Sequence, residues 1–444
     1  MASKPLPGFR DFYPAEFAER AYIVNTWRDV ARRYAFVEYD GPPLEPLELY
    51  TRKSGEEIVG QLYNFTDKGG REISLRPEMT PTFARMVAER ANALRKPVRW
   101  FSVPQLFRYE RQQRGRLREH FQLNVDIVGE ADVSADAELL AVAVDIMRGF
   151  GLTPDDVVAR VSDRRLLSAL LRASGASEEQ LPAIYGVIDK IERTPRDASV
   201  EKLQGAGLAP DTIESILATI DRSDLDAIEA AYGSSAEVGA RVADLRRYFA
   251  SLKSLGAADW ARLDLKIVRG LAYYTGIVFE IFDTKGELRA VCGGGRYDTL
   301  LSALGGVDLP ALGFGMGDVV LGELLRARGL MPSAAPGIDF WVAADDAELQ
   351  PMVLSTATLL RRLGYSVEYA LRDQSLGKQL KAAGSAGVRV AVLLKRDAIA
   401  QRGEVVLRRL EDGTEETLPM QAWLEQLTAE LRERSANGQP MTNG

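Results

Sequence analysis

Residues 107–128 read FRYERQQRGRLREHFQLNVDIV, a pattern that predicts two paired β-strands. The second half alternates apolar and polar side chains, which is the period of a strand with one face turned into a core. The apolar positions are Phe121, Leu123, Val125 and Ile127, and the polar positions are His120, Gln122, Asn124 and Asp126. Residues 111–115 predict the hairpin loop. The polar face of this hairpin would display Arg108, Glu110, Arg116, Gln122 and Asp126 together.

This polar face has two interpretations. An antiparallel sheet with one solvated face shows the same alternation, and such sheets are common. The face nevertheless combines aligned arginines with acceptor groups. Arginine forks bind phosphates through two hydrogen bonds, and a carboxylate accepts from a ligand amine. We therefore favour a ligand-binding face.

A second arginine-containing segment, RGLAYYTG, spans residues 269–276. Gly270 permits a bend, and Tyr273 with Tyr274 offers ring faces and phenolic hydroxyls, as a small polar pocket requires. A turn beside the core is the alternative interpretation. Taken with the hairpin, Arg269 and the two tyrosines predict a site that holds an adenine nucleotide and a small zwitterion together.

The glycine-rich segments do not match the common nucleotide-binding loops. Gly293-Gly294-Gly295 lacks the Lys-Ser/Thr pair of a P-loop. Gly313-x-Gly315-x-Gly317 differs from the dinucleotide fingerprint. The sequence therefore disfavours a P-loop enzyme and a Rossmann dehydrogenase.

Composition limits the remaining chemistry. The chain has 444 residues, which predicts two or three domains. One cysteine, Cys292, excludes an intrachain disulfide, and one histidine, His120, disfavours a conventional zinc site and a Ser-His-Asp triad. A net charge of -7 argues against nonspecific coating of nucleic acid. No apolar run suggests a membrane span or a signal peptide, so the default expectation is a cytoplasmic protein without a membrane partner.

The chain is expected to divide into several parts. Residues 1–150 and 261–330 form the two halves of a strand-rich core, which includes a helix over 14–35 and another that starts at Ser134. Residues 151–260 predict a mainly helical insertion. Prolines near 330–337 predict a linker. Residues 337–425 alternate short strands and helices, which predicts an α/β domain with a largely parallel sheet, and residues 435–444 predict a disordered tail.

The chain resembles the histidyl-tRNA synthetases, a class II aminoacyl-tRNA synthetase family. The resemblance runs from Gly8-Phe9-Arg10-Asp11 to about Pro419. It rests on residues 75–80 (LRPEMT), 107–126, 269–275 and 293–298 (GGGRYD), in this order. It implies an α+β catalytic core, an antiparallel sheet flanked by helices, and a C-terminal domain similar to the family's anticodon-binding domain. It also implies a homodimer formed through the helix at 16–34 and the strand near Pro42.

The same resemblance implies a two-step reaction, in which L-histidine and ATP form histidyl-adenylate and the histidyl group then passes to tRNA(His). Arg108 would hold the α-phosphate, Arg269 would be the catalytic arginine, and Mg²⁺ would bind the pyrophosphate. The other ATP-binding residues would be Glu110, Arg116 and His120. Histidine would be bound by Glu78, Thr80, Gln122, Asp126, Tyr273 and Tyr274. The tRNA acceptor stem would face Gln112, Gln113 and Arg114.

Three positions depart from the family pattern. Val320 occupies the place of the motif 3 arginine that contacts the ATP γ-phosphate, Ala272 replaces an aspartate, and His120-Phe121 inverts the usual order. Some members of the family, including plant-type relatives, are similar to this chain in reading Arg-Gly-Leu-Ala-Tyr-Tyr and Gly-Met-Gly-Asp, which indicates a subgroup. One alternative is the synthetase-like regulatory subunit of ATP phosphoribosyltransferase, which binds histidine as a signal. Another class II synthetase is a second alternative.

Overall fold

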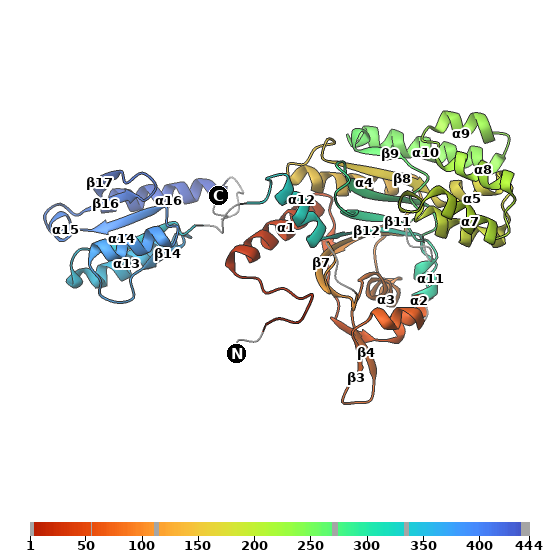
Figure 1. Ribbon diagram of the computed structural model, residues 1–444. Coiled ribbons are helices and arrows are strands. Elements are labelled where there is room, and N and C mark those ends of the chain that lie inside the picture. The colour runs from red at the N-terminus through yellow and green to blue at the C-terminus, as the bar shows by residue number, and fades with distance from the viewer. Residues whose placement is uncertain (1–3, 55, 111–114, 269–273, 333–336, 437–444) are drawn as a thin grey trace. The chain divides into compact units, whose positions relative to one another are not determined.

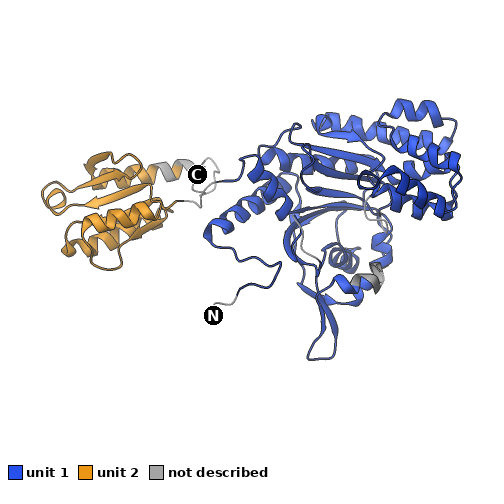
Figure 2. Cartoon of the chain, in the orientation of Figure 1, with its two compact units in different colours: residues 1–332 blue, residues 333–444 orange. Residues whose placement is uncertain are grey.

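The computed structural model describes residues 4–54, 56–110, 115–268, 274–332 and 337–436. The chain forms two compact units, residues 1–332 and 333–444 (Figure 2). The boundary lies within the stretch where the sequence predicts a linker. Each unit has a sheet and an apolar core of its own.

The first unit is built on one large sheet (Figure 1). Its strands among the described residues are β1 (Val37–Glu38), β5 (Val98–Ser102), β6 (Gln105–Phe107), β7 (Glu119–Val128), β8 (Val157–Asp163), β9 (Ala261–Leu263), β10 (Ile277–Asp283), β11 (Cys292–Arg296) and β12 (Ala311–Gly317). The order is β1-β5-β7-β12-β11-β10-β8-β9, and β6 pairs with β7. Pairing is antiparallel, except that β1 with β5 and β8 with β9 are parallel. The expected class II sheet flanked by helices is confirmed.

The predicted hairpin is present, but its strands are displaced. Strand β6 ends at Phe107, so Arg108 and Glu110 lie in the connection and not on a strand face. Strand β7 keeps the alternation: Leu123, Val125 and Ile127 are fully or almost fully buried in the core. This core is completed by helices α1 (Pro14–Arg33), α4 (Val133–Gly149) and α12 (Asp318–Ala327).

Helix α1 follows the predicted apolar spacing. Pro14 stands in its first turn, where a missing N–H costs nothing, and Ala31 and Trp27 are among its buried residues. The Trp27 side chain is fully buried, and its indole Nε1 donates to Met316 Sδ at 3.2 Å. Trp27 therefore ties α1 to β12, one of the central strands.

Helix α4 starts one residue before the predicted start at Ser134. Asp132 is the N-cap residue, and its carboxylate accepts from the backbone N–H of Ser134 at 2.9 Å. Asp136, which the sequence suggests is an ordinary charge of the first turn, is buried and bonded to Arg296 of β11. Because both charges are removed from water, this pair fixes the start of α4 against the end of β11.

The region 151–260 is largely helical, as expected, but it begins with a strand of the main sheet. Strand β8 pairs with β10 along its whole length, from Asp163 to Val157. The insertion therefore contributes a strand to the main sheet, which the sequence did not indicate. The helices that follow are α5 (Arg164–Ala173), α6 (Leu181–Ile188), α7 (Arg196–Gly205), α8 (Pro210–Ile220), α9 (Leu225–Tyr232) and α10 (Ala236–Ser254).

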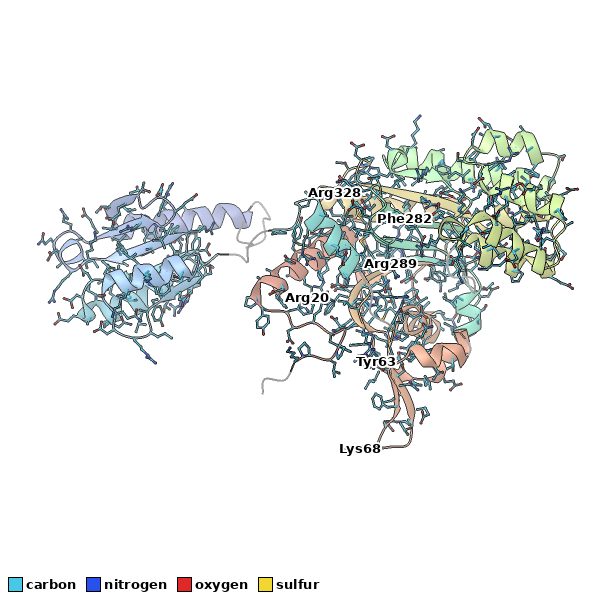
Figure 3. The ribbon with its side chains drawn as sticks, in the orientation of Figure 1. Arg20, Tyr63, Lys68, Phe282, Arg289 and Arg328 are labelled. Atoms are coloured by element: carbon cyan, nitrogen blue, oxygen red, sulfur yellow. The ribbon has the colours of Figure 1, made fainter. Side chains whose placement is uncertain are left out.

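A smaller antiparallel sheet, of order β2-β4-β3, lies beside the main one. It contains β2 (Leu44–Pro46), β3 (Asn64–Thr66) and β4 (Glu72–Leu75). The hairpin of β3 and β4 projects outward with Lys68 at its tip (Figure 3). Helices α2 (Glu48–Ser54), α3 (Thr80–Arg90) and α11 (Leu300–Gly305) pack nearby.

The second unit has a mixed sheet of order β14-β13-β15-β16-β17. Its strands are β13 (Phe340–Ala344), β14 (Val367–Tyr369), β15 (Val390–Leu394), β16 (Glu404–Arg409) and β17 (Glu415–Pro419), and its helices are α13 (Gln350–Arg362), α14 (Leu376–Ser385), α15 (Arg396–Arg402) and α16 (Met420–Ala436). The first three strands are parallel, as predicted, but β16 and β17 add an antiparallel edge. Helix α16 includes residues 435 and 436 of the predicted tail, and 437–444 lie outside the described residues. No helix in the described ranges is long and apolar enough to cross a membrane.

Replacing Trp27 by alanine should lower the free energy of unfolding by about 3–5 kcal/mol, because the cavity left behind cannot fully collapse. The change would be measured as a shift of the thermal or denaturant midpoint. The control is Phe65→Ala on β3, whose side chain is 49% exposed and should shift the midpoint far less. Equal losses in both variants would contradict the packing described for α1.

Candidate active site

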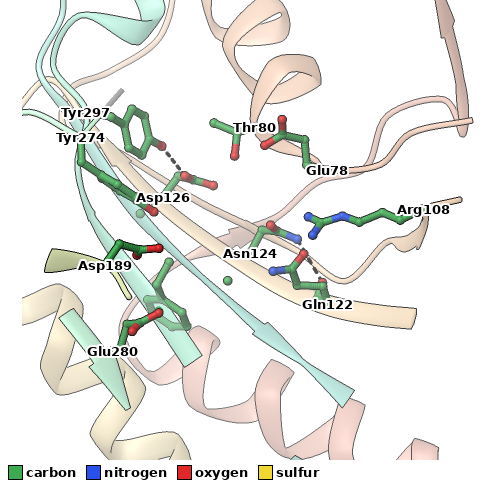
Figure 4. Close-up of a pocket in the computed structure, with 14 residues that line it drawn as sticks. Glu78, Thr80, Arg108, Gln122, Asn124, Asp126, Asp189, Tyr274, Glu280 and Tyr297 are labelled. Carbon is green, nitrogen blue, oxygen red and sulfur yellow. Dashed lines mark hydrogen bonds between the residues drawn. The ribbon is translucent and has the colours of Figure 1, made fainter. Parts of the chain in front are cut away.

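A cavity of about 350 Å³ lies on the face of the main sheet opposite to α1, α4 and α12 (Figure 4). Strands supply most of its lining: Gln122, Asn124 and Asp126 from β7, Gly313, Phe314 and Gly315 from β12, Gly293 from β11, and Glu280 from β10. Connecting segments supply Glu78, Thr80, Arg108, Asp189, Tyr274 and Tyr297. Gln122, Asn124 and Asp126 of β7 thus face the cavity, while Leu123, Val125 and Ile127 face the core.

Glycines of two adjacent strands make the floor of this cavity. The pairing register places Asn124, Gly315, Gly293 and Glu280 in one row across four strands. A Cβ atom on Gly313 would lie 2.1 Å from Asp126 Oδ1, and one on Gly315 would lie 2.1 Å from Gln122 Nε2. Because those contacts are impossible, glycine is required for the β7 side chains to lie across β12.

Asp126 is the most deeply buried acid of the cavity, with 5% of its surface exposed. The Tyr297 hydroxyl donates a hydrogen bond to its Oδ1. Burial raises the pKa of Asp126 to about 7, and the bond from Tyr297 only partly opposes this effect. The carboxylate is therefore an acceptor whose ionised form is costly until a donor ligand reaches it.

The LRPEMT segment, residues 75–80, is held in place by Arg76. This buried guanidinium donates from Nη1 to the carbonyl of Gly41 at 2.7 Å and from Nε to the carbonyl of Gln105 at 3.1 Å. Glu78 and Thr80, which follow, reach the cavity. Arg108 Nε donates to the carbonyl of Pro77 at 3.0 Å, and its guanidinium points toward Asn124 and Glu78 (Figure 4). One short segment therefore positions both an acid and an arginine.

The cavity brings together six of the predicted site residues. They are Glu78, Thr80, Arg108, Gln122, Asp126 and Tyr274. Glu110, Arg116 and His120 do not line it, but Glu110 and Arg116 form an ion pair. The other predicted site residues lie outside the described residues; they are Arg269, Tyr273, Gln112, Gln113 and Arg114.

His120 lies at the start of β7, near the same arginines. Burial, together with the positive charges of Arg108, Arg10 and Arg116, lowers the pKa of His120 to about 3. The imidazole is therefore neutral at physiological pH. Of these three arginines, Arg10 pairs with Glu119 and Asp318, and Arg116 pairs with Glu110.

The motif 3 position Val320 lies in the first turn of α12, against Gly115. A Cβ atom on Gly115 would be 3.2 Å from Val320 Cγ2. The neighbouring Asp318 accepts from the backbone N–H of Phe121 at 3.0 Å and pairs with Arg10 at 2.9 Å. Arg10 also bonds Glu119 at 2.6 Å. Asp318, two residues before Val320, therefore anchors the N-terminal segment to β7 through Arg10 and Phe121.

Sequence reasoning missed several lining residues. Gly313 and Gly315 were noted only as a failed dinucleotide motif, although glycine at alternate strand positions is a signal for a close approach. Tyr297 stood within the GGGRYD motif without a role. Asp189 follows α6 of the helical region, and no local pattern indicated it.

The described lining is rich in acids. Glu78, Asp126, Asp189 and Glu280 carry carboxylates, and Arg108 is the cation among these residues. Such a cavity suits a ligand with donor or cationic groups at one end and an anionic group near Arg108. A zwitterion with a further ring N–H meets this description.

Replacing Asp126 by asparagine should raise the free energy of unfolding at pH 8. Because the folded pKa, about 7, exceeds the unfolded value, the folded parent binds the proton more tightly between about pH 4 and pH 7. Its stability should therefore fall as pH rises through this window, by up to roughly 4 kcal/mol.

Denaturation of both proteins at pH 5 and pH 8 would measure this difference, with the exposed Asp373→Asn as the control. The asparagine variant should lose the fall in stability and should also lose affinity for the ligand. Parallel pH profiles in parent and variant would show that the buried carboxylate is not strained.

Comparisons with known proteins agree with this geometry. Residues 8–317 match the family model described as histidyl-tRNA synthetase, and residues 339–430 match the one described as an anticodon binding domain. The chain is 43% identical to a histidine--tRNA ligase of Opitutus terrae over 96% of this chain and 98% of that one. It is 41% identical to the chloroplastic/mitochondrial histidine--tRNA ligase of Arabidopsis thaliana over 92% of this chain and 83% of that one.

Among solved structures, the histidyl-tRNA synthetase of Nostoc sp. PCC 7120 is similar, with a TM-score of 0.83 and 25% identity over 97% of this chain and 99% of that one. The match covers the sheet, the cavity and the second unit. The chain belongs to the histidyl-tRNA synthetase family of aminoacyl-tRNA ligases.

Proposed function

We propose that this chain activates L-histidine with ATP and transfers the histidyl group to tRNA(His). The observation that carries the proposal is the acidic cavity with its floor of glycines. Both a buried acid, Asp126, and an arginine, Arg108, line this cavity. Histidine has donor groups for the acids and a carboxylate that must meet the ATP α-phosphate.

Histidine would be recognised mainly by Asp126. Its buried oxygen would accept a ring N–H, and Tyr297 already fixes its orientation. An isostere without ring N–H groups would leave this acceptor unpaired, which is the strongest form of rejection available to a small pocket. Gln122, Tyr273 and Tyr274 would complete the imidazole pocket. Glu78 and Thr80 would accept from the α-amino group.

Adenylate formation is an in-line attack of the histidine carboxylate on the α-phosphate. The protein must position two anions and stabilise the charge that develops. Arg108 would bind the α-phosphate, and Arg269 would act from the other side. Mg²⁺ would accompany ATP. The described residues contain no cluster of three potential metal ligands, so the triphosphate oxygens would supply most of its coordination.

The adenine end of ATP would lie toward the start of β7. There His120 is neutral and can stack on a base, Glu110 can accept from the adenine amino group, and Arg116 can bind the outer phosphates. The proximity of Arg108 and Arg116 to His120 supports this placement.

The tRNA would contact both units. Gln112, Gln113 and Arg114 would face the acceptor stem. In the second unit, Arg389 and Arg396 are engaged in ion pairs, whereas Arg372, Lys378 and Lys381 are exposed and have no acidic partner among the described residues. These three cations are the better candidates for contacts with the phosphates of the anticodon arm.

A homodimer in the cytoplasm completes the proposal. Val37 lies on the edge strand β1 and is 62% exposed, and Phe17 at the start of α1 is 50% exposed. Both belong to the segments through which the family resemblance implies dimerisation.

The regulatory-subunit alternative is disfavoured, because that paralogue generally lacks an anticodon-binding domain and this chain matches one.

The purified chain should catalyse ATP–pyrophosphate exchange that depends on histidine. Arg269→Ala should lower the exchange rate about 100-fold or more, because one of the two cations at the α-phosphate is lost. Arg262→Ala, on the exposed surface of β9, is the control and should retain exchange. Histidine binding without any exchange in the parent would favour the regulatory alternative.

Removal of the second unit, leaving residues 1–332, should retain pyrophosphate exchange and lower tRNA charging about 100-fold or more, because one of two linked binding surfaces is lost. The two activities would be measured on the same preparation, with circular dichroism to confirm folding. Equal loss of both activities would mean that the second unit only supports the fold.

A further inference from the structure

Two consecutive arginines at the start of α5 hold the chain on both sides of residues 269–273. Arg164 Nη1 donates to the carbonyl of Val268 at 2.9 Å. Arg165 Nε donates to the carbonyl of Thr275 at 2.8 Å. The backbone N–H of Arg164 also donates to the carbonyl of Gly276 at 3.0 Å. The first helix of the helical region therefore holds Val268 on one side of this segment, and Thr275 and Gly276 on the other.

Asp298 connects the same helix to Thr275 through its side chain and backbone. Arg165 Nη2 pairs with Asp298 Oδ2 at 2.7 Å. The backbone N–H of Asp298 donates to Thr275 Oγ1 at 3.0 Å. The backbone N–H of Thr275 donates to the carbonyl of Arg296 at 2.8 Å. Thr275 is thus held by groups from α5 and from the GGGRYD turn at once.

Tyr274 immediately precedes Thr275, the residue that these contacts hold. It lines the histidine cavity and also a neighbouring cavity of about 490 Å³, which Arg164 and Arg165 line as well. Strand β10 begins only at Ile277, so the ladder of the sheet does not fix residue 274. Tyr274 packs against the apolar cluster that contains Phe83, and the bonds to Thr275, its immediate neighbour, add to that packing.

We propose that Arg165, Asp298 and Thr275 form a positioning clamp that sets Tyr274 in the histidine pocket. The inference rests on the proposed function and adds to it that the helical region determines histidine affinity. These three residues do not line the histidine cavity themselves. They act through Tyr274.

The clamp contributes little to folding. The Arg165 side chain is 45% exposed and Asp298 is 24% exposed, and ion pairs this close to solvent stabilise a fold weakly. A purely structural role would therefore leave enzyme kinetics almost unchanged. A positioning role would change the KM for histidine without a matching change in thermal midpoint.

Thr275→Val is the sharpest test, because it keeps the shape of the side chain and removes only the hydroxyl that Asp298 contacts. The KM for histidine in pyrophosphate exchange should rise about tenfold, the scale expected when such a hydrogen bond is lost. The KM for ATP and the thermal midpoint should stay near the parent values. Thr275→Ser, which restores the hydroxyl, should restore the KM for histidine.

Arg165→Lys tests the other half of the clamp. A lysine can reach one of the two acceptors but not both, so the KM for histidine should again rise. Arg172→Lys on the same helix is the matched control, because Arg172 pairs with Glu178 and Glu237 away from Tyr274. An unchanged KM for histidine in Thr275→Val, or equal increases in both KM values with a lower thermal midpoint, would overturn the clamp.

These results stay distinct from a failure of the proposed function. If the parent shows no histidine-dependent exchange, the proposed function fails. Calorimetric titration with histidine then tests the clamp by itself, and equal dissociation constants for parent and Thr275→Val would overturn it. Absence of histidine binding in the parent would overturn both proposals.

Discussion

The central constraint of this structure is the absence of side chains on one face of β11 and β12. Elsewhere in the sheet, side chains fill both faces, as the buried Leu123 and Val125 do on the core side. On the cavity side, Gly293, Gly313 and Gly315 leave room above the backbone, and Asp126 and Gln122 lie over β12 where Cβ atoms would otherwise be. The cavity thus lies on one face of the sheet, and the apolar core on the other face stays packed.

Burial of Asp126 gives the cavity its chemical character. Asp126 is desolvated, and the strain appears as a raised pKa. Asp136 is also buried, but Arg296 binds it directly. The second arrangement fixes α4 and β11, while the first leaves an acceptor available for a ligand. Burial raises the pKa of both acids, but their surroundings differ: Asp136 is bound by Arg296, whereas Asp126 accepts a hydrogen bond from the neutral Tyr297 hydroxyl and faces the cavity.

The region 151–260 contributes both to the main sheet and to the lining of the cavity. Strand β8 extends the catalytic sheet, Arg164 and Arg165 hold the chain beside Tyr274, and Asp189 reaches the cavity mouth. A region that resembles an insertion along the chain therefore contributes to the lining of the cavity. A change in its packing has a short path, through Thr275, to the residues proposed to bind histidine.

The sequence by itself determined the alternation of β7, the helical face of α1, the parallel strands of the second unit and the identity of most polar residues in the cavity, because these depend on local periodicity and on short motifs. It did not predict that β8 joins the main sheet, that Asp136 meets Arg296, or that Asp189 and Glu280 share a cavity with Asp126. Each of these unites residues that are distant along the chain, and local pattern carries no information about such partners. Gly313 is the intermediate case. Its spacing was visible in the sequence, but the reason for glycine appeared only when the fold placed Asp126 against it.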